Sequence, residues 1–180
     1  SEDYIVYCQE DFILTDTLHY EEINRCINVL DSTDYSFVRL VKTDIGAWKH
    51  YSECRKRNWE KITLDENIFC AHSTDFDAFS FQMQATIWKK NDISKLYDYV
   101  KSEKWLENRE WDKGVRETNT KGAYYYKDSL QEGPYHHAPE VWPHICTAVG
   151  RGKWSLSLHR ERLLNVLNEY GIDPRERGIR

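Results

Sequence analysis

The sequence has little glycine and little proline, which make up 8 and 4 of its 180 residues. This scarcity excludes collagen-like chains and glycine–serine linkers. A hydrophobic content of 40% also excludes an intrinsically disordered chain, because such chains bury too little apolar surface to offset the entropy lost on folding. The length lies within the range of about 100–200 residues per domain. We therefore predict a single domain over residues 1–180.

The sequence also lacks an excess of positive charge. Its 30 acidic residues outnumber 25 lysines and arginines, so the formal net charge is −5. Proteins that bind duplex nucleic acid usually carry clustered Lys and Arg to neutralise phosphates. The densest basic run, at residues 55–57, is flanked by Glu53 and Glu60, which is typical of a solvated helix face. We expect no nucleic-acid partner.

Long hydrophobic runs are absent. No stretch approaches the roughly 18 uninterrupted apolar residues that a membrane-spanning helix needs. The start at residues 1–3 is acidic, and no apolar segment of the length found in signal peptides follows it, so we expect no signal peptide. Cysteines are few, widely spaced and without a C-x-x-C pair: Cys8, Cys26, Cys54, Cys70 and Cys146. This pattern favours reduced thiols and a cytoplasmic location over a zinc knuckle or a disulfide scaffold, and leaves a single catalytic cysteine open.

Aromatic side chains are abundant, at 14% of the residues. Rings with polar tips suit carbohydrate, nucleotide and partner surfaces, but they also fill hydrophobic cores. For any single ring, a core position is the better prediction.

The N-terminal pattern predicts a strand, a helix and a second strand. Residues 4–8 form a β-branched and aromatic run typical of a buried strand. A helix capped by Asp16 or Thr17 is expected to reach about Leu30, and the alternation at residues 35–40 indicates a strand. The residues predicted to face the core from this helix are Ile23, Cys26, Ile27 and Leu30. A β-α-β order favours an α/β sheet with parallel neighbours.

Further elements are predicted along the rest of the chain. Residues 61–64, 79–83 and 122–126 resemble strands. Asp92 is expected to open a helix, with its inward side chains at Ile93, Leu96, Tyr97 and Val100. A last helix is predicted at about residues 157–170, closed by Gly171 and followed by Pro174. The expected fold is α/β, with a mixed, mainly parallel sheet flanked by helices.

Two adjacent carboxylates, Glu10 and Asp11, follow the first predicted strand. In open α/β sheets, ligands bind outside the carboxyl ends of the strands. Carboxylates there suit Mg²⁺ or Mn²⁺ bound to a phosphate. On the local pattern alone, a solvated turn is slightly favoured.

A second candidate pairs carboxylates with indole rings. Glu107 and Glu110 are spaced i, i+3 and are bracketed by Trp105 and Trp111. A carboxylate beside such rings is desolvated and its pKa rises, which suits a general base. By spacing alone, an amphipathic helix with salt bridges is the more frequent structure.

Three histidines, His136, His137 and His144, lie close together in a predicted loop region. Imidazoles can ligate a metal, but the spacing H-H-x₆-H matches no standard zinc site. Hydrogen-bonded loop histidines are the more frequent outcome.

Residues 150–154 contain two glycines, Gly150 and Gly152, which flank Arg151, and Lys153 follows Gly152. Glycines let backbone amides approach an anion, while Arg and Lys supply charge for a phosphate. The segment is not a P-loop, which needs G-x-x-x-x-G-K-[ST]. A glycine turn with exposed basic residues is an equally good interpretation.

In their order along the chain, these motifs resemble the second half of a GT-A-type, nucleotide-sugar-dependent glycosyltransferase. Residues 3–12 look like the strand that ends in its acidic, DxD-like motif, and residues 79–90 are similar to the strand and I-W segment beside its acceptor site. Residues 105–108 resemble the tryptophan–acid segment that follows. Residues 150–154 look like a basic return loop near the donor phosphates. The resemblance covers about residues 3–155.

The resemblance implies a GT-A-like, Rossmann-like fold that is truncated at its N-terminal side. GT-A enzymes place a nucleotide-binding half before the acidic motif, whereas only two residues precede Asp3. Either the numbering begins partway through a longer chain, or the protein is a degenerate relative. The motif is also Glu-Asp followed by Phe12, not a full Asp-x-Asp.

The activity that the resemblance implies is metal-dependent transfer of a sugar from a nucleoside diphosphate donor to a carbohydrate hydroxyl. Mn²⁺ or Mg²⁺ is the implied cofactor. The implied metal-binding residues are Asp11, Glu10 and His144; the donor-binding residues are Arg151 and Lys153; the acceptor-binding residues are Trp105, Trp111 and Trp142; and the catalytic bases are Glu107 and, as second choice, Glu110.

Two alternatives from other classes remain open at this point. One is a non-catalytic carbohydrate- or protein-binding module that uses exposed Trp and Tyr. The other is a metal-dependent hydrolase that uses His136, His137 and His144 with Asp11.

Overall fold

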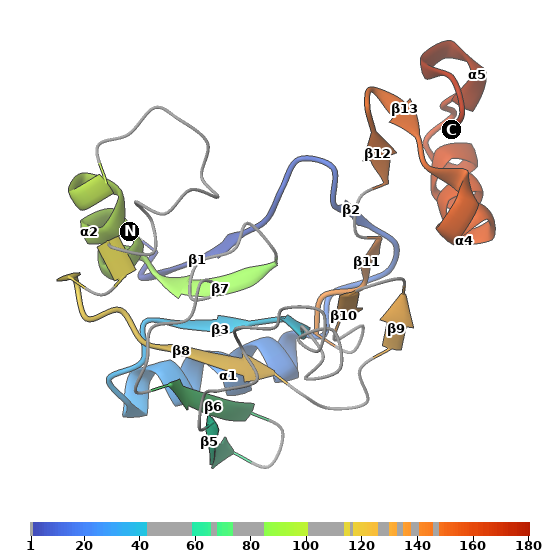
Figure 1. Cartoon of the computed structure of the whole chain (residues 1–180). Helices are drawn as coiled ribbons and strands as arrows, with labels where there is room; N and C mark the ends of the chain where they lie inside the picture. Colours follow the sequence, from blue (N-terminus) through green and yellow to red (C-terminus); the bar gives the residue numbers. More distant parts are fainter. Residues whose placement is uncertain are drawn as a thin grey trace.

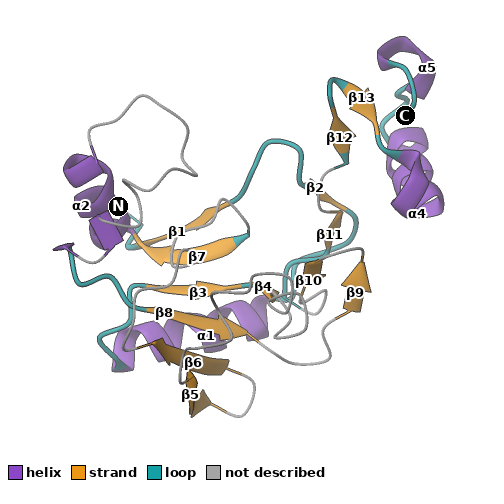
Figure 2. Ribbon diagram, viewed as in Figure 1, coloured by secondary structure: helices purple, strands orange, loops and turns teal. Residues whose placement is uncertain are grey.

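The structure is a computed structural model. It describes residues 2–42, 59–65, 68–73, 85–100, 114–115, 117–125, 130–132, 135–137, 141–145 and 148–180. The helices are α1 (Tyr20–Ser32), α2 (Lys90–Val100), α4 (Leu156–Glu169) and α5 (Pro174–Arg177). The strands are β1 (Tyr4–Tyr7), β2 (Ile13–Leu14), β3 (Phe37–Arg39), β4 (Val41–Lys42), β5 (Trp59–Asp65), β6 (Ile68–Ser73), β7 (Thr86–Lys89), β8 (Gly122–Tyr125), β9 (Leu130–Glu132), β10 (Tyr135–His137), β11 (His144–Ile145), β12 (Val149–Gly150) and β13 (Lys153–Trp154) (Figures 1 and 2).

The largest sheet has six strands in the order β1-β7-β3-β8-β6-β5 (Figure 1). Its β3–β8 pair is parallel, while β1–β7, β7–β3, β8–β6 and β6–β5 are antiparallel. The mixed α/β class is therefore confirmed, but the expectation of a mainly parallel sheet is wrong for the strands that the structure describes. The predicted strand at residues 79–83 lies outside the described residues.

The predicted β-α-β unit is present with a strand inserted into it. β1 and β3 both run antiparallel to β7, so they point the same way without being neighbours. The prediction of parallel neighbours fails because β7, which comes from far along the chain, occupies the place between them. β1 is thereby an edge strand, and its residues are half-buried, not buried as the sequence predicts.

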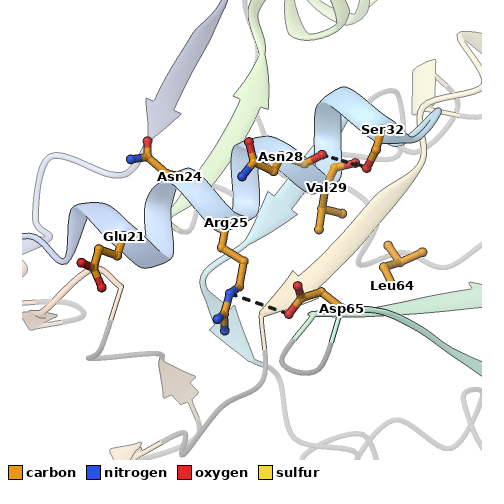
Figure 3. Close-up of a pocket in the computed structure, with 8 residues that line it drawn as sticks. All are labelled: Glu21, Asn24, Arg25, Asn28, Val29, Ser32, Leu64 and Asp65. Carbon is orange, nitrogen blue, oxygen red and sulfur yellow. Dashed lines mark hydrogen bonds and ion pairs between the residues drawn. The ribbon is translucent and has the colours of Figure 1, made fainter.

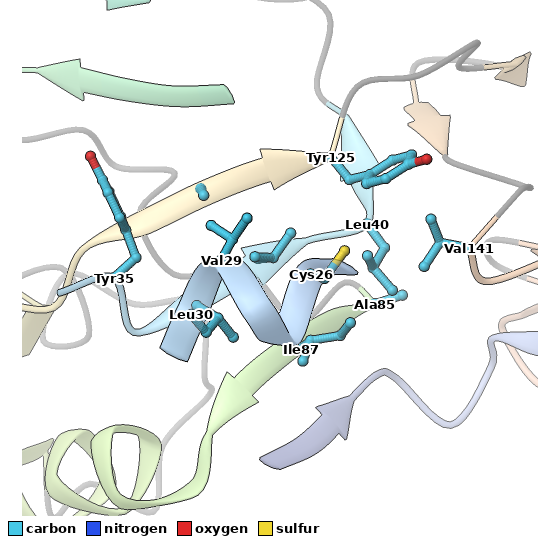
Figure 4. Packing of buried hydrophobic residues seen from close by; sticks show 11 residues of the cluster. Cys26, Val29, Leu30, Tyr35, Leu40, Ala85, Ile87, Tyr125 and Val141 are labelled. Atoms are coloured by element: carbon cyan, nitrogen blue, oxygen red, sulfur yellow. The ribbon is translucent and has the colours of Figure 1, made fainter. Parts of the chain in front are cut away.

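α1 and α2 cover opposite faces of this sheet. Successive residues of a strand point to opposite faces, and Val38 packs in the α1 cluster while Phe37 packs in the α2 cluster. On the α1 side, Cys26 and Leu30 are fully buried (Figure 4). On the α2 side, the rings of Phe37 and Trp88 lie with their centroids 4.4 Å apart.

The inner face of α1 is as predicted, but its start is not. Ile23 and Ile27 are partly buried against the same cluster as Cys26 and Leu30. The helix begins at Tyr20 after an N-cap residue, His19, that makes no side-chain cap. The Asp16 carboxylate instead accepts a hydrogen bond from the backbone N–H of its neighbour Thr17 at 2.7 Å.

α2 differs from prediction in one inward position. Ile93 and Leu96 are buried, and Val100 packs partly buried beside them. Tyr97 is 40% exposed, so the prediction that it faces the core is wrong. Its hydroxyl lies 3.4 Å from that of Tyr7, at the rim of the sheet, because the phenol oxygen needs a polar neighbour.

The C-terminal helix is confirmed as α4, and its end follows the sequence signals. Gly171 has a φ of 65°, and the N–H of Ile172 donates to the carbonyl of Leu167, as in a glycine-terminated helix. Pro174 then opens α5, where Asp173 caps the helix by accepting from the N–H of Arg175. The core under α4 is a separate cluster that includes Ile145, Trp154, Leu156, Leu163 and Leu167.

None of the described helices is both long enough and apolar enough to cross a membrane.

Candidate functional site

The acidic motif lies in the loop that leaves β1. The N–H of Phe12 donates to the carbonyl of Gln9 at 3.1 Å, which closes a turn over Glu10 and Asp11. The carbonyl of Asp11 in turn accepts from the N–H of Ala148 at 3.0 Å. Ala148 directly precedes β12, so the acidic motif is joined to the base of the β12–β13 hairpin (Figure 1). Two predicted motifs that are far apart in the sequence thus adjoin.

The two carboxylates differ in their exposure. Asp11 is half-buried and Glu10 is exposed. Burial raises the pKa of Asp11, its own backbone N–H partly lowers it, and the charge of Glu10 raises it again. A cation beside Asp11 would offset the repulsion that its carboxylate experiences from Glu10.

The basic segment forms a tight hairpin. Gly150 pairs with Lys153, and the two residues between them, Arg151 and Gly152, have φ values of 53° and 77°. Positive φ at both positions is typical of a type I′ turn. A Cβ at Gly152 would meet nothing within 4 Å, so glycine serves the backbone conformation there and not a close approach. The segment is a glycine turn in which Arg151 and Lys153 are exposed, and their role in binding a donor phosphate stays a prediction.

One face of the hairpin carries the exposed side chain of Lys153. Paired residues of an antiparallel ladder share a face, so Lys153 lies on the face of Gly150. Ala148, which precedes this hairpin, is fully buried in the cluster under α4. Its backbone N–H bond to the Asp11 carbonyl therefore places the acidic turn at the base of the hairpin.

His144 is a buried structural residue in β11. It is fully buried, and its Nδ1 lies 2.5 Å from the carbonyl oxygen of Trp142, to which it donates. Its ring stacks on Phe12 with centroids 5.1 Å apart. The imidazole therefore holds the residue after the acidic motif against the loop before β11. Trp142 itself is partly buried against the α1 cluster, and its role in acceptor stacking stays a prediction.

Arg162 is a residue of this region that the sequence analysis missed. Its Nη2 donates to the hydroxyl of Thr15 at 3.0 Å and to the carbonyl of His144 at 3.3 Å. It thereby connects α4 to the β2–β11 pair that follows the acidic turn. In the sequence it is one basic residue among several on a helix, and no local signal distinguishes it.

The described residues bring no three His, Cys, Asp or Glu side chains close enough to hold a metal ion. Asp11, Glu10 and His144 are therefore not a joint ligand set. Mg²⁺ commonly takes one or two carboxylates together with substrate phosphates. Asp11 and Glu10 fit a metal of that kind, because they supply two adjacent carboxylates and Mg²⁺ prefers oxygen ligands.

Several predicted site residues cannot be placed. Glu107, Glu110, Trp105 and Trp111 lie outside the described residues. His136 and His137 lie on β10, which pairs with β4 and β9. The structure describes the backbone of these two residues and not their side chains.

A groove of about 440 Å³ between α1 and the end of β5 is a different feature (Figure 3). Its lining is mostly polar and includes Arg25, whose Nε lies 3.9 Å from Oδ1 of Asp65. No predicted site residue and no aromatic ring lines it. We therefore place the candidate site at the acidic turn and the hairpin.

Comparison of the chain with protein-family models, with curated proteins and with solved structures gave no match.

Proposed function

We propose that this protein transfers a sugar from a nucleoside diphosphate donor to a carbohydrate hydroxyl, with Mg²⁺ or Mn²⁺ as cofactor. The observation that carries the proposal is the hydrogen bond between the Asp11 carbonyl and Ala148 N–H, which joins the acidic turn to the hairpin of Arg151 and Lys153. A carboxylate pair beside exposed cations suits a metal–diphosphate group, since the metal needs oxygen ligands and the diphosphate needs positive charge.

The chain's own residues have distinct roles in this proposal. Asp11, with Glu10, would hold the metal, which when bound offsets negative charge on the leaving diphosphate. Arg151 and Lys153 would neutralise the remaining charge as the bond from the sugar C1 to the diphosphate oxygen breaks. The acceptor oxygen forms the new bond to C1 and loses its proton to a base, for which we propose Glu107, or Glu110 in its place.

We extend the proposal to the fold and the compartment. The acidic motif follows the carboxyl end of a strand in a mixed sheet, as a GT-A-like fold would require. Cys8 and Cys26 are free thiols, which fits a reducing, cytoplasmic environment.

The test measures nucleotide release from a panel of nucleoside diphosphate sugars with Mn²⁺ present, with and without added oligosaccharide. We expect release from at least one donor, and we expect Asp11→Asn to abolish metal-dependent donor binding in a calorimetric titration while the protein stays folded. Asp98→Asn, an exposed carboxylate on α2, is the matched control and should behave as wild type.

Two outcomes would count against the proposal. If Asp11→Asn titrates donor with Mn²⁺ as wild type does, the metal role of Asp11 is wrong. If no donor releases nucleotide but oligosaccharide alone binds, the protein is a carbohydrate-binding module.

A further inference from the structure

Residues 178–180 run beside β13 of the β12–β13 hairpin and are linked to it by an isolated parallel bridge. The N–H of Trp154 donates to the carbonyl of Gly178 at 3.0 Å, and the N–H of Arg180 donates to the carbonyl of Trp154 at 2.8 Å. Ile179 is thereby bridged to Trp154 in parallel. Residues 178–180 are thus held against β13 by two backbone hydrogen bonds.

The two faces of this small sheet differ in character. Bridged residues share a face, so Ile179, which is itself 47% exposed, points to the same side as Trp154, a member of the α4 core cluster. Gly178 and Arg180 then lie with Lys153 on the opposite side, because successive strand residues alternate. The side chains of Lys153 and Arg180 therefore lie on the face of the hairpin that is opposite the α4 cluster.

The glycine positions give independent evidence for this arrangement. A Cβ built on Gly150 would lie 2.8 Å from Nη1 of Arg180, so the guanidinium rests over the bare backbone of Gly150. A Cβ on Gly178 would lie 3.8 Å from Cδ of Lys153. Gly150 therefore leaves room for the guanidinium of Arg180, while the Lys153 side chain lies in ordinary van der Waals range of Gly178.

These cations are not engaged elsewhere in the described part of the chain. Nearby Arg175 is paired with Asp173 at 2.7 Å, and Cζ of Arg177 lies 4.9 Å from the centre of the Trp154 ring. Lys153 and Arg180 are exposed, and neither forms an ion pair with any described residue. Two neighbouring positive charges repel each other, so a compact anion between them is favoured.

We propose that Lys153 and Arg180 form a phosphate-binding site on the glycine-lined face of the hairpin. The ligand chemistry is a phosphate or diphosphate group, since the forked guanidinium binds two phosphate oxygens and the ammonium adds a point charge. The inference rests on the proposed function in one respect, since the first candidate source of this phosphate group is the diphosphate of the sugar donor. A phospholipid headgroup is the second source. Arg180 lies outside the motif at residues 150–154. It is brought to the hairpin by the backbone bridge between Ile179 and Trp154.

The test is a calorimetric titration of the full chain with inorganic pyrophosphate, without divalent metal so that Asp11 does not contribute. We expect Arg180→Gln and Lys153→Gln each to weaken binding about tenfold, the loss of one charge-assisted hydrogen bond. Arg160→Gln, the same change at an exposed residue of α4, should bind as wild type.

Gly150→Ala is a second and more specific probe. Its methyl group would stand 2.8 Å from Nη1 of Arg180 and displace the guanidinium without changing any charge. We expect a several-fold loss of pyrophosphate affinity, smaller than that of Arg180→Gln, with an unchanged circular dichroism spectrum.

Vesicles distinguish the two sources of phosphate. Phosphatidylcholine vesicles with and without phosphatidylglycerol are sedimented with wild type and with Arg180→Gln. Arg180-dependent binding of pyrophosphate supports a soluble ligand, and Arg180-dependent binding of phosphatidylglycerol vesicles alone supports a headgroup phosphate.

The proposal is overturned if Arg180→Gln binds both pyrophosphate and phosphatidylglycerol vesicles as tightly as wild type does. It is also overturned if Arg160→Gln loses as much pyrophosphate affinity as Arg180→Gln. Nucleotide release is measured separately, so that the two proposals fail separately. A protein that binds pyrophosphate through Arg180 but releases nucleotide from no donor supports this site and contradicts the proposed function.

Discussion

Phe37 occupies the space that a side chain at Gly122 would need. The two residues are paired in the parallel β3–β8 ladder, and a Cβ on Gly122 would lie 2.0 Å from Cζ of Phe37. Carbon atoms in contact are about 3.5–4.0 Å apart. The Phe37 ring would therefore have to move by roughly 1.5 Å or more, toward Trp88. Both rings are 1% exposed and their centroids lie 4.4 Å apart, so the core has no room for that movement.

We expect Gly122→Ala to lower the free energy of unfolding by about 3 kcal/mol, the upper part of the range for overpacked cores. Phe37→Leu alone should cost about 1.5 kcal/mol. Because the smaller side chain relieves the contact, the double variant should be at least about 1 kcal/mol more stable than the sum of the two effects.

The assay is urea denaturation followed by tryptophan fluorescence, analysed as a double-mutant cycle. Gly152→Ala is the control, because its Cβ would meet nothing within 4 Å and only the positive φ of 77° is penalised. That variant should lose about 1 kcal/mol. The reasoning is refuted if Gly122→Ala is no less stable than Gly152→Ala, or if the effects at Gly122 and Phe37 add.

Two further predictions concern the α4 connection and the thiols. Arg162→Met removes the bonds to Thr15 and to the His144 carbonyl and should cost about 2 kcal/mol in urea denaturation; an unchanged midpoint would contradict this. Burial raises the pKa of Cys26 to about 12, so iodoacetamide at pH 8 should alkylate exposed Cys8 first, and equal rates by mass spectrometry would contradict this. Since the Cys26 thiol stays protonated when folded but ionises near 9.0 when unfolded, its contribution to stability is full below pH 9 and is lost as pH rises toward 12.

Local patterns in the sequence account for the elements that depend on neighbours along the chain. The inward stripe of α1, with Cys26 and Leu30, follows from helical spacing alone. The end of α4 follows from Gly171, whose positive φ other residues rarely adopt. The position of Asp11 after a strand also follows from neighbours along the chain, because the β-branched and aromatic run at residues 4–8 precedes it. The start of a helix is harder to predict. Asp16 and Thr17 are typical N-cap residues, but α1 begins after His19, which makes no side-chain cap.

The order of the strands depended on contacts that no local pattern contains. β7 inserts between β1 and β3 because its residues pack on both faces at once: Ile87 in the α1 cluster and Trp88 in the α2 cluster. Alternating residues mark a strand but do not specify its neighbour, so an antiparallel insertion and a parallel pair look alike in the sequence.

The sequence by itself determined the chemical groups of the candidate site: a carboxylate pair after a strand, and two cations in a segment with two glycines. Only the tertiary structure decided that Asp11 is bonded to Ala148, that Arg180 rests over Gly150, and that His144 is buried on Phe12. The reason is physical. Residue types and short spacings follow from the chain, whereas these contacts join segments over 25 residues apart that meet only when their apolar faces are buried together.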